Sequence, residues 1–265
     1  MSWFFLTLSV ESLHRLRNVI FEHRLYLPMV GVSIFFSAGA CLLFEERKKV
    51  IVACSVPILI FSVATYRRNE VWRDGVRLWQ DVVKKSPESA RSYKNLGFAY
   101  LEGGRYDDAI ASCRKAIELD PADAKVYNNI GLAYGKQGRY DDAIASCRKA
   151  IELDPTYAKA YNNLGIAYGE KGHAEKEIEY YQKAIELDPA YPQAYGNLGS
   201  AYLERGEYDR AIAAYQKAIQ LDPDYVKAHS NLAMAYLAKK DKTGLTRQVE
   251  RLKKLGRRDL AEELE

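Results

Sequence analysis

The 265-residue sequence lacks the patterns that mark most enzymes and metal-binding proteins. It has four cysteines without a CxxC pair, and four scattered histidines without an HExxH motif or a Cys/His spacing suited to zinc. No GxGxxG motif follows a predicted strand, and neither a Walker phosphate-binding loop nor a nucleophile elbow occurs. The sequence therefore predicts no catalytic residues, no metal site and no cofactor.

Strong charge of one sign is also missing. The formal net charge is +4, and no basic run is interleaved with stacking aromatic residues. A nucleic-acid-binding surface normally needs both features, so we do not expect nucleic acid as a partner.

What the sequence has instead is a repeated phrase. The segment Tyr127–Tyr134 recurs with small changes at Tyr93–Tyr100, Tyr161–Tyr168, Tyr195–Tyr202 and His229–Tyr236, each time about 34 residues further on. When each unit is numbered from its first residue, position 7 is Leu or Ile, position 8 is Gly in four units of five, and a proline closes the unit. These residues are Leu96, Ile130, Leu164, Leu198 and Leu232; Gly97, Gly131, Gly165 and Gly199; and Pro121, Pro155, Pro189 and Pro223.

In these columns the sequence resembles the tetratricopeptide repeat (TPR) family. The resemblance implies an all-α helical solenoid of five helix-turn-helix repeats over residues 90–259, at 90–123, 124–157, 158–191, 192–225 and 226–259, followed by a tail at 260–265. We expect a first helix over about positions 2–14 of each unit and a second over about positions 17–30. The fifth repeat is polar on its outer side, which predicts a degenerate cap.

Two departures within the repeats carry structural expectations. Glu177 stands where three other repeats have alanine, so we expect looser packing in the third repeat. Cys113 and Cys147 occupy the same position in neighbouring repeats, about 10 Å apart by helix packing, whereas a disulfide tolerates about 7 Å. We expect both to be thiols in the core.

Two long uncharged runs precede the repeats, at residues 25–44 and 50–66. The first would be about 30 Å long as a helix, which matches the hydrocarbon thickness of a bilayer. Buried core helices are the alternative, although a repeat array offers no second layer to cover them. We expect an N-terminal flank at 1–24, a two-helix transmembrane hairpin over 25–66 and thus an integral membrane protein.

Residues 67–89 predict a juxtamembrane helix that forms half a repeat. Val71, Gly75, Trp79 and Val82 fall on one helical face, and Gly75 and Trp79 stand 34 residues before Ala109 and Cys113. The segment therefore has the pattern of a second helix without its first.

The segment Glu22–Gly31, with the sequence EHRLYLPMVG, resembles the end of the membrane domain of TPR-containing GT-C type glycosyltransferases, the transmembrane and TPR-containing family. The resemblance implies that Arg24 contacts the phosphate of a lipid-linked sugar donor. A cation at the end of a spanning helix is the alternative. The catalytic acidic residue of that family lies many helices upstream and has no counterpart here, so the resemblance implies a C-terminal fragment more than an activity.

The side of the membrane that holds the repeats stays open. Seven arginines flank the predicted hairpin on the side of both termini, against Arg47, Lys48 and Lys49 in its loop, which favours cytoplasmic repeats. The glycosyltransferase resemblance implies the opposite, lumenal or periplasmic, side.

Position 6 is asparagine in all five repeats: Asn95, Asn129, Asn163, Asn197 and Asn231. A side-chain amide both donates and accepts hydrogen bonds, so it can pair with the main chain of any peptide. This column resembles the asparagine array of the O-linked N-acetylglucosamine transferase, which implies a peptide-binding groove on the concave side. The alternative is hydrogen bonding within the helix surface.

Position 2 adds positive charge on the same helix face, through Arg91, Lys125, Lys159 and Lys227, with Gln193 as the exception. Four cations in one groove favour acidic ligands, although a solvated charged face is the alternative. The dicarboxylate clamp of some TPR domains is only partly matched, because Phe98 and Asn163 replace two of its residues.

These patterns predict a non-enzymatic, membrane-anchored scaffold that binds an extended segment of a partner protein, and the cations at position 2 favour an acidic segment. The alternative is the C-terminal part of a polyprenyl-phosphate-sugar-dependent protein O-glycosyltransferase, whose repeats would present the acceptor polypeptide. A third possibility is a module for oligomerisation.

Overall fold

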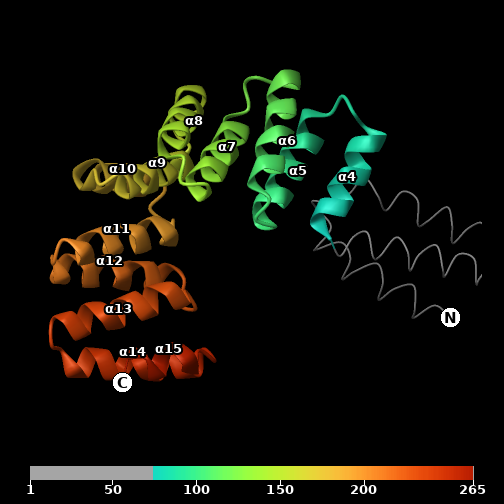
Figure 1. Cartoon of the computed structure of the whole chain (residues 1–265). Coiled ribbons are helices and arrows are strands. Elements are labelled where there is room, and N and C mark those ends of the chain that lie inside the picture. Colours follow the sequence, from blue (N-terminus) through green and yellow to red (C-terminus); the bar gives the residue numbers. More distant parts are fainter. Residues whose placement is uncertain (1–73, 265) are drawn as a thin grey trace, which may run out of the picture. The chain divides into compact units, whose positions relative to one another are not determined.

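The computed structural model of the chain describes residues 74–264, and every element in that part is an α-helix (Figure 1). The first helices of the five repeats are α5 (Ala90–Glu102), α7 (Ala124–Lys136), α9 (Ala158–Glu170), α11 (Pro192–Glu204) and α13 (Val226–Ala238). The second helices are α6 (Tyr106–Leu119), α8 (Tyr140–Leu153), α10 (Ala174–Leu187), α12 (Tyr208–Leu221) and α14 (Lys242–Lys254). The predicted helical solenoid is confirmed.

The helix boundaries follow from the local sequence. In the first four repeats the first helix covers positions 1–13 and the second covers 17–30, within a residue of the prediction. Between them the chain turns at a residue such as Gly104, whose φ of 70° is costly for residues with a Cβ. In the first four repeats the second helix stops at an aspartate such as Asp120, which is extended because proline follows it.

Within a repeat, the two helices pack closely because position 8 is glycine. A Cβ added at Gly97 would lie 2.5 Å from Cys113 Sγ, and one added at Gly199 would lie 2.7 Å from Tyr215 Cε1. The column at position 24 (Cys113, Cys147, Tyr181, Tyr215) therefore uses the space that the glycine column leaves open.

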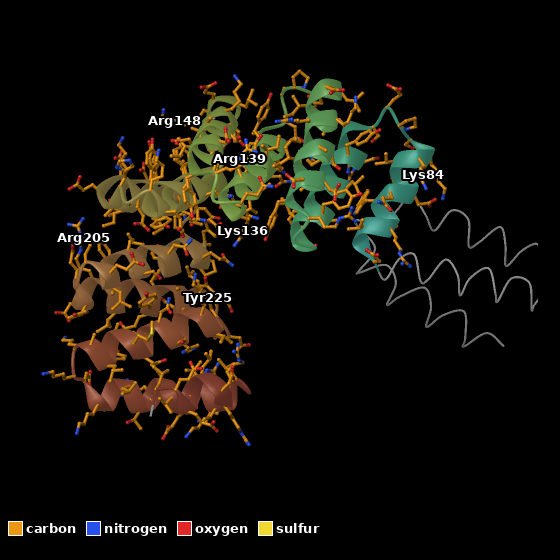
Figure 2. The ribbon with its side chains drawn as sticks, viewed as in Figure 1. Lys84, Lys136, Arg139, Arg148, Arg205 and Tyr225 are labelled. Carbon is orange, nitrogen blue, oxygen red and sulfur yellow. The ribbon has the colours of Figure 1, made fainter. Side chains whose placement is uncertain are left out.

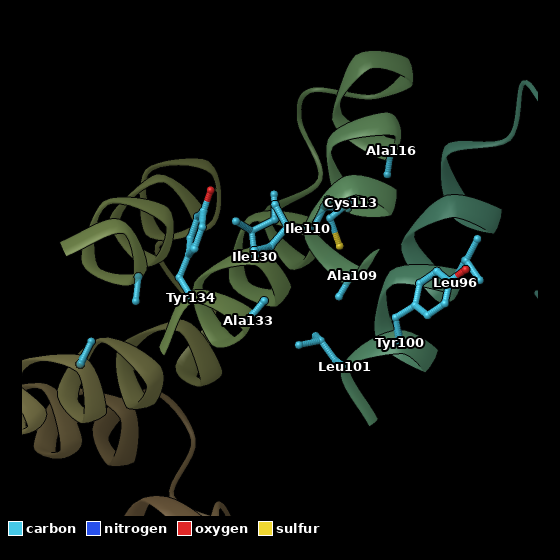
Figure 3. Close-up of a cluster of buried hydrophobic side chains, with 13 residues drawn as sticks. Leu96, Tyr100, Leu101, Ala109, Ile110, Cys113, Ala116, Ile130, Ala133 and Tyr134 are labelled. Carbon is cyan, nitrogen blue, oxygen red and sulfur yellow. The ribbon is translucent and has the colours of Figure 1, made fainter. Parts of the chain in front are cut away.

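The buried side chains form several clusters along the array. The first, shown in Figure 3, gathers residues such as Leu96, Ile110, Cys113 and Ile130 from α5, α6 and α7. A second lies around Tyr215 and includes side chains from α10 to α13. This distribution is expected for repeats, since each unit buries its apolar side chains only against its neighbours.

Contacts between helices identify the inner side of the array. Each first helix touches the first helix of the next repeat, from α5 to α13, whereas successive second helices make no comparable contact. The first helices therefore line the inner side, where side chains from neighbouring repeats meet.

Two further helices flank the repeats. Helix α4 (Gly75–Lys85) packs on α5, and Gln80 Nε2 donates a 2.8 Å hydrogen bond to the Tyr100 hydroxyl, as the second helices do in later repeats. Helix α15 (Arg258–Glu262) packs on α14, where Val249 and Leu252 are buried beneath a polar outer side, as a cap requires.

Two expectations about single residues can be compared with the structure. Cys113 and Cys147 are buried free thiols, as predicted. Glu177 is half-buried and fills the space beside Gly169, where an added Cβ would lie 2.5 Å from the Glu177 carboxyl carbon. The third repeat thus gains a carboxylate in its packing instead of an empty space.

The predicted transmembrane hairpin at 25–66 and Arg24 lie outside the described residues. Among residues 74–264, no helix combines the length and the apolar character needed to cross a bilayer.

Candidate binding face

We define the first-helix face as the residues at positions 2, 6 and 9 of helices α5, α7, α9, α11 and α13. These positions lie three or four residues apart, so they share one side of each helix. The face collects every predicted site residue except Arg24, because all of those residues belong to positions 2 and 6.

The cations at position 2 are exposed and unpaired. Arg91, Lys125, Lys159 and Lys227 all lie on the surface, and none forms a side-chain ion pair within residues 74–264. Some other lysines are paired with carboxylates, as Lys115 is with Glu118 at 2.5 Å, although the exposed Lys136 and Lys242 form no ion pair within residues 74–264 either. The unpaired cations give this edge of the face positive charge, with Asp123 two residues before Lys125 and Asp222 and Asp224 beside Lys227 as the nearby carboxylates.

The asparagines at position 6 are half-buried and fall into two groups. Asn163 Nδ2 donates to Asn128 Oδ1 at 2.9 Å, and Asn197 Nδ2 donates to Asn162 Oδ1 at 2.9 Å. Asn231 Nδ2 donates to Ser200 Oγ at 3.1 Å. These three amides therefore join the first helices of successive repeats.

Asn95 and Asn129 make no side-chain hydrogen bond within the described residues. For Asn129 the cause is the residue at position 5 of the preceding repeat, because that position supplies the acceptor for Asn163 and Asn197. For Asn129 that residue is Lys94, which cannot accept and instead pairs with Asp123 at 2.5 Å. The amide of Asn129 thus has no hydrogen-bond partner among the described side chains.

Position 9 adds an apolar row that the sequence analysis did not single out. The Phe98 side chain is 47% exposed, Met234 is 44% exposed, and Leu132 and Ile166 are half-buried. In the fourth repeat the residue is Ser200, which accepts from Tyr215 Oη at 3.1 Å and from Asn231. The row is therefore apolar in four repeats and tied into a polar network in one.

A pocket of about 500 Å³ lies at the C-terminal end of the face. Lys227, Ser230 and Asn231 line it from α13, and Arg257 and Leu260 line it from the capping segment. The carboxylates of Asp222 and Asp224, just before α13, belong to the same lining. The Arg257 guanidinium is paired with Asp259 at 2.6 Å, so Lys227 is the unpaired cation at this pocket.

A contact that recurs at equivalent positions of the repeats was also missed in the sequence analysis. It joins the tyrosine at position 11 to the second helix of the preceding repeat. Arg114, Arg148, Gln182 and Gln216, all at position 25, donate to the hydroxyls of Tyr134, Tyr168, Tyr202 and Tyr236 at 2.6–3.2 Å (Arg148 is labelled in Figure 2). Arg or Gln at position 25 of the first four repeats, 20 residues before the tyrosine of the following repeat, was the signal that could have revealed it.

Each of these tyrosines in the first four repeats also has a cation over its ring. Arg105 lies 4.5 Å from the Tyr100 centroid and Arg139 lies 4.2 Å from that of Tyr134, both from position 16. In the fourth repeat position 16 is Glu207, and Arg210 at position 19 takes over at 4.0 Å from Tyr202. The cation and its carboxylate partner have exchanged places while the ring contact is kept.

The described residues offer little for covalent or metal chemistry. Burial raises the pKa of the Cys147 thiol to about 12, so it stays protonated and is a poor nucleophile. No group of three or more His, Cys, Asp or Glu side chains within residues 74–264 is arranged to hold a metal ion. The first-helix face instead carries exposed cations, half-buried amides and a partly exposed apolar row, which are groups used in non-covalent recognition.

Comparison with family models identifies the repeats. Models described as "TPR repeat" match residues 99–138 and 199–240, and models described as "Tetratricopeptide repeat" match residues 124–157, 146–179 and 180–213. Together these matches run without a gap from residue 99 to residue 240.

Comparison with curated proteins finds the protein O-mannosyl-transferase Tmtc1 of Drosophila melanogaster, which is 31% identical over 106 residues. The match covers 37% of this chain and 12% of that protein, so the chain spans only a small part of the transferase.

Solved structures share the architecture. MamA is 31% identical, with a TM-score of 0.50 over 62% of this chain and 95% of its own. YrrB, described as a TPR protein with an unusual peptide-binding site, is 21% identical, with a TM-score of 0.50 over 70% of this chain and 96% of its own. Because the family matches together cover more than half of the chain without a gap, the chain belongs to the tetratricopeptide repeat proteins.

Proposed function

We propose that the chain is a membrane-anchored scaffold whose first-helix face binds an extended, acidic segment of a partner protein. The observation that carries the proposal is the row of unpaired cations at position 2 beside the amides at position 6. The cations would attract an acidic segment, and the amides would pair with its main chain. YrrB, which shares the fold, has a peptide-binding site of its own.

The anchoring part of the proposal rests on residues 25–66. Their two uncharged runs have the length and composition of membrane-spanning helices. Extraction of cell membranes with alkaline carbonate tests this part, since the full chain should stay in the membrane pellet and a variant without residues 25–66 should be released.

A second function, part of a protein O-glycosyltransferase, is favoured by two observations. Curated relatives of the repeats are named protein O-mannosyl-transferases, and Glu22–Gly31 resembles the end of the membrane domain in that family. In that case the same face would present an acceptor polypeptide to a catalytic domain. Reading the gene upstream of Met1 for further spanning segments and an acidic loop residue discriminates between the two functions.

Peptide display on the purified full chain in detergent tests the binding function. We expect the selected peptides to be rich in Asp and Glu and to bind less tightly as salt rises. A variant with Arg91, Lys125, Lys159 and Lys227 changed to alanine should bind these peptides about ten-fold more weakly, because each surface charge contributes modestly to affinity.

A matched control is available on the second helices. Lys115, Lys149, Lys183 and Lys217 share position 26, and changing all four to alanine removes the same number of positive charges from the second helices of the first four repeats. Equal losses in the two quadruple variants would show non-specific attraction, and the proposed binding face would be wrong.

A further inference from the structure

We propose that the main-chain-binding amides of the scaffold are only Asn95 and Asn129, and that this site selects an extended segment in which acidic and apolar side chains alternate. The inference rests on the proposed function and deepens it. It divides the asparagine column into a binding pair in the first two repeats and a set of structural bonds in the other three.

An asparagine at position 6 can bind a peptide main chain only if its amide has free donors and acceptors. A peptide main chain needs an N–H and a C=O partner at each contact, and an amide already bonded to its neighbour offers less of both. Asn163 is bonded on both sides, because Asn162 Nδ2 lies 3.4 Å from its Oδ1 while its own Nδ2 donates to Asn128. Asn95 and Asn129 have no such partners within residues 74–264.

Position 5 explains why the division falls between the second and third repeats. Asn128 and Asn162 are buried acceptors at that position, and each fixes the asparagine of the following repeat. Lys94 stands there in the first repeat, and its ammonium is held by Asp123. The free amide of Asn129 is thus a direct consequence of one lysine.

The spacing of the pair defines the length of ligand that it grips. Neighbouring first helices pack about 10 Å apart, and an extended chain rises about 3.3 Å per residue. Asn95 and Asn129 therefore contact main-chain groups about three residues apart, and a segment of about six residues covers both repeats with their flanking side chains.

The residues on either side of Asn95 and Asn129 determine which ligand side chains fit. On one side of position 6 lie the unpaired cations Arg91 and Lys125; on the other lie Phe98, with 47% of its surface exposed, and Leu132. Successive side chains of an extended segment point in opposite directions. One set therefore meets the cations and the other meets the apolar row, which requires acidic and apolar residues in alternation.

The probe is a fluorescein-labelled peptide in which glutamate alternates with phenylalanine or leucine, titrated into the full chain and followed by anisotropy. A second peptide of the same composition, with its glutamates grouped at one end, is the ligand control. We expect the alternating peptide to bind and the grouped peptide to bind about ten-fold more weakly, since it cannot satisfy both flanks at once.

Two double variants test the division of the column. Asn95→Ala with Asn129→Ala should weaken binding about ten-fold, because two hydrogen bonds to the ligand are lost. Asn163→Ala with Asn197→Ala should change it by about two-fold or less. Equal losses in the two variants would overturn the inference.

A third variant tests the division without removing an asparagine. Lys94→Asn gives the first repeat the acceptor that the second and third already have, so the Asn129 amide should bond to it and leave the ligand. Lys94→Ala removes the same ion pair with Asp123 but adds no acceptor. We expect weaker binding in the asparagine variant than in the alanine variant, and the reverse order would contradict the inference.

The outcomes separate the inference from the function on which it rests. If display selects peptides but the alternating peptide does not bind, the ligand chemistry inferred here is wrong and the scaffold function stands. If neither display nor the alternating peptide gives binding, the scaffold function itself is wrong.

Discussion

The first two repeats and the next two have the same backbone but different interiors. Helices α6 and α8 have one identical sequence and place Cys113 and Cys147 at position 24, whereas α10 and α12 place Tyr181 and Tyr215 there. The short side chains of Cys113 and Cys147 stay within the core. The Tyr215 hydroxyl reaches Ser200 on the first-helix face and joins the network that holds Asn231.

This difference shows how one repeat pattern serves two purposes. In the first two repeats the face keeps free amides beside an exposed Phe98, and in the later repeats its polar groups bond to one another. A repeat array is stabilised by contacts between neighbouring units. A side chain of the first-helix face that bonds to a neighbouring repeat therefore has fewer donors and acceptors left for the ligand that we propose.

We expect the largest difference in stability when the side chain at position 24 is removed, once in the later repeats and once in the first two. Tyr215→Ala should cost about 3–5 kcal/mol, because it empties a fully buried ring site and leaves Ser200 without that donor. Cys147→Ala removes one buried atom and should cost about 1 kcal/mol. Chemical unfolding followed by circular dichroism measures both, and similar costs would mean that the two interiors pack equivalently.

The asparagine column gives the next test, now on stability instead of binding. Asn163→Ala leaves the buried Asn128 acceptor without its donor and should cost about 1–3 kcal/mol. Asn129→Ala breaks no bond in the described residues and should change the free energy of unfolding by less than about 0.5 kcal/mol. Equal costs would show that Asn129 has a structural partner after all.

The tyrosines at position 11 allow a smaller comparison. Tyr202 Oη accepts from Gln182 at 3.2 Å and from Arg210 at 2.7 Å, whereas Tyr134 Oη accepts from Arg114 at 3.0 Å and has Arg139 over its ring. Tyr202→Phe should therefore cost about 1–2 kcal/mol and Tyr134→Phe about 1 kcal/mol or less, since each net hydrogen bond contributes about that amount. Thermal unfolding of the two variants checks the order, and a larger loss for Tyr134→Phe would contradict it.

The fold was predictable from the sequence because its causes are local and repeated. Glycine at position 8, tyrosine at position 11 and proline at the end of the unit each impose the same geometry five times or nearly so. The division of the asparagine column was not predictable from position 6, which is uniform. It depends on position 5 of the preceding repeat, where Lys94 differs from Asn128 and Asn162, and a contact across repeats appears only when two columns are considered together.

The same limit applies to Glu177. Its column predicts only that alanine is replaced by a larger, charged residue. That the carboxylate lies beside Gly169, half-buried and near Glu170 and Glu204, depends on the glycine at position 12 and on the next repeat.

Glu177 also gives the smallest and most specific prediction, a dependence on pH that the first two repeats should lack. Burial raises the pKa of this carboxyl above its ordinary value, and the neighbouring charges of Glu204 and Glu170 add to the rise, against a hydrogen bond from Tyr181 that lowers it. The folded chain therefore holds a proton in a window where the unfolded chain has lost it, so its stability falls as pH rises through that window.

Glu177→Gln removes this titration while it keeps the size and a polar tip. Its Tm should match that of the unaltered chain near pH 4, below the ordinary pKa of glutamate, and exceed it by about 1–3 °C at pH 7. Glu179→Gln, an exposed neighbour on the same helix, is the control and should show no such divergence. If both variants behave alike across the pH range, the carboxylate of the third repeat is as well solvated as an ordinary surface group, and the packing of that repeat does not differ electrostatically from the alanine-containing repeats before it.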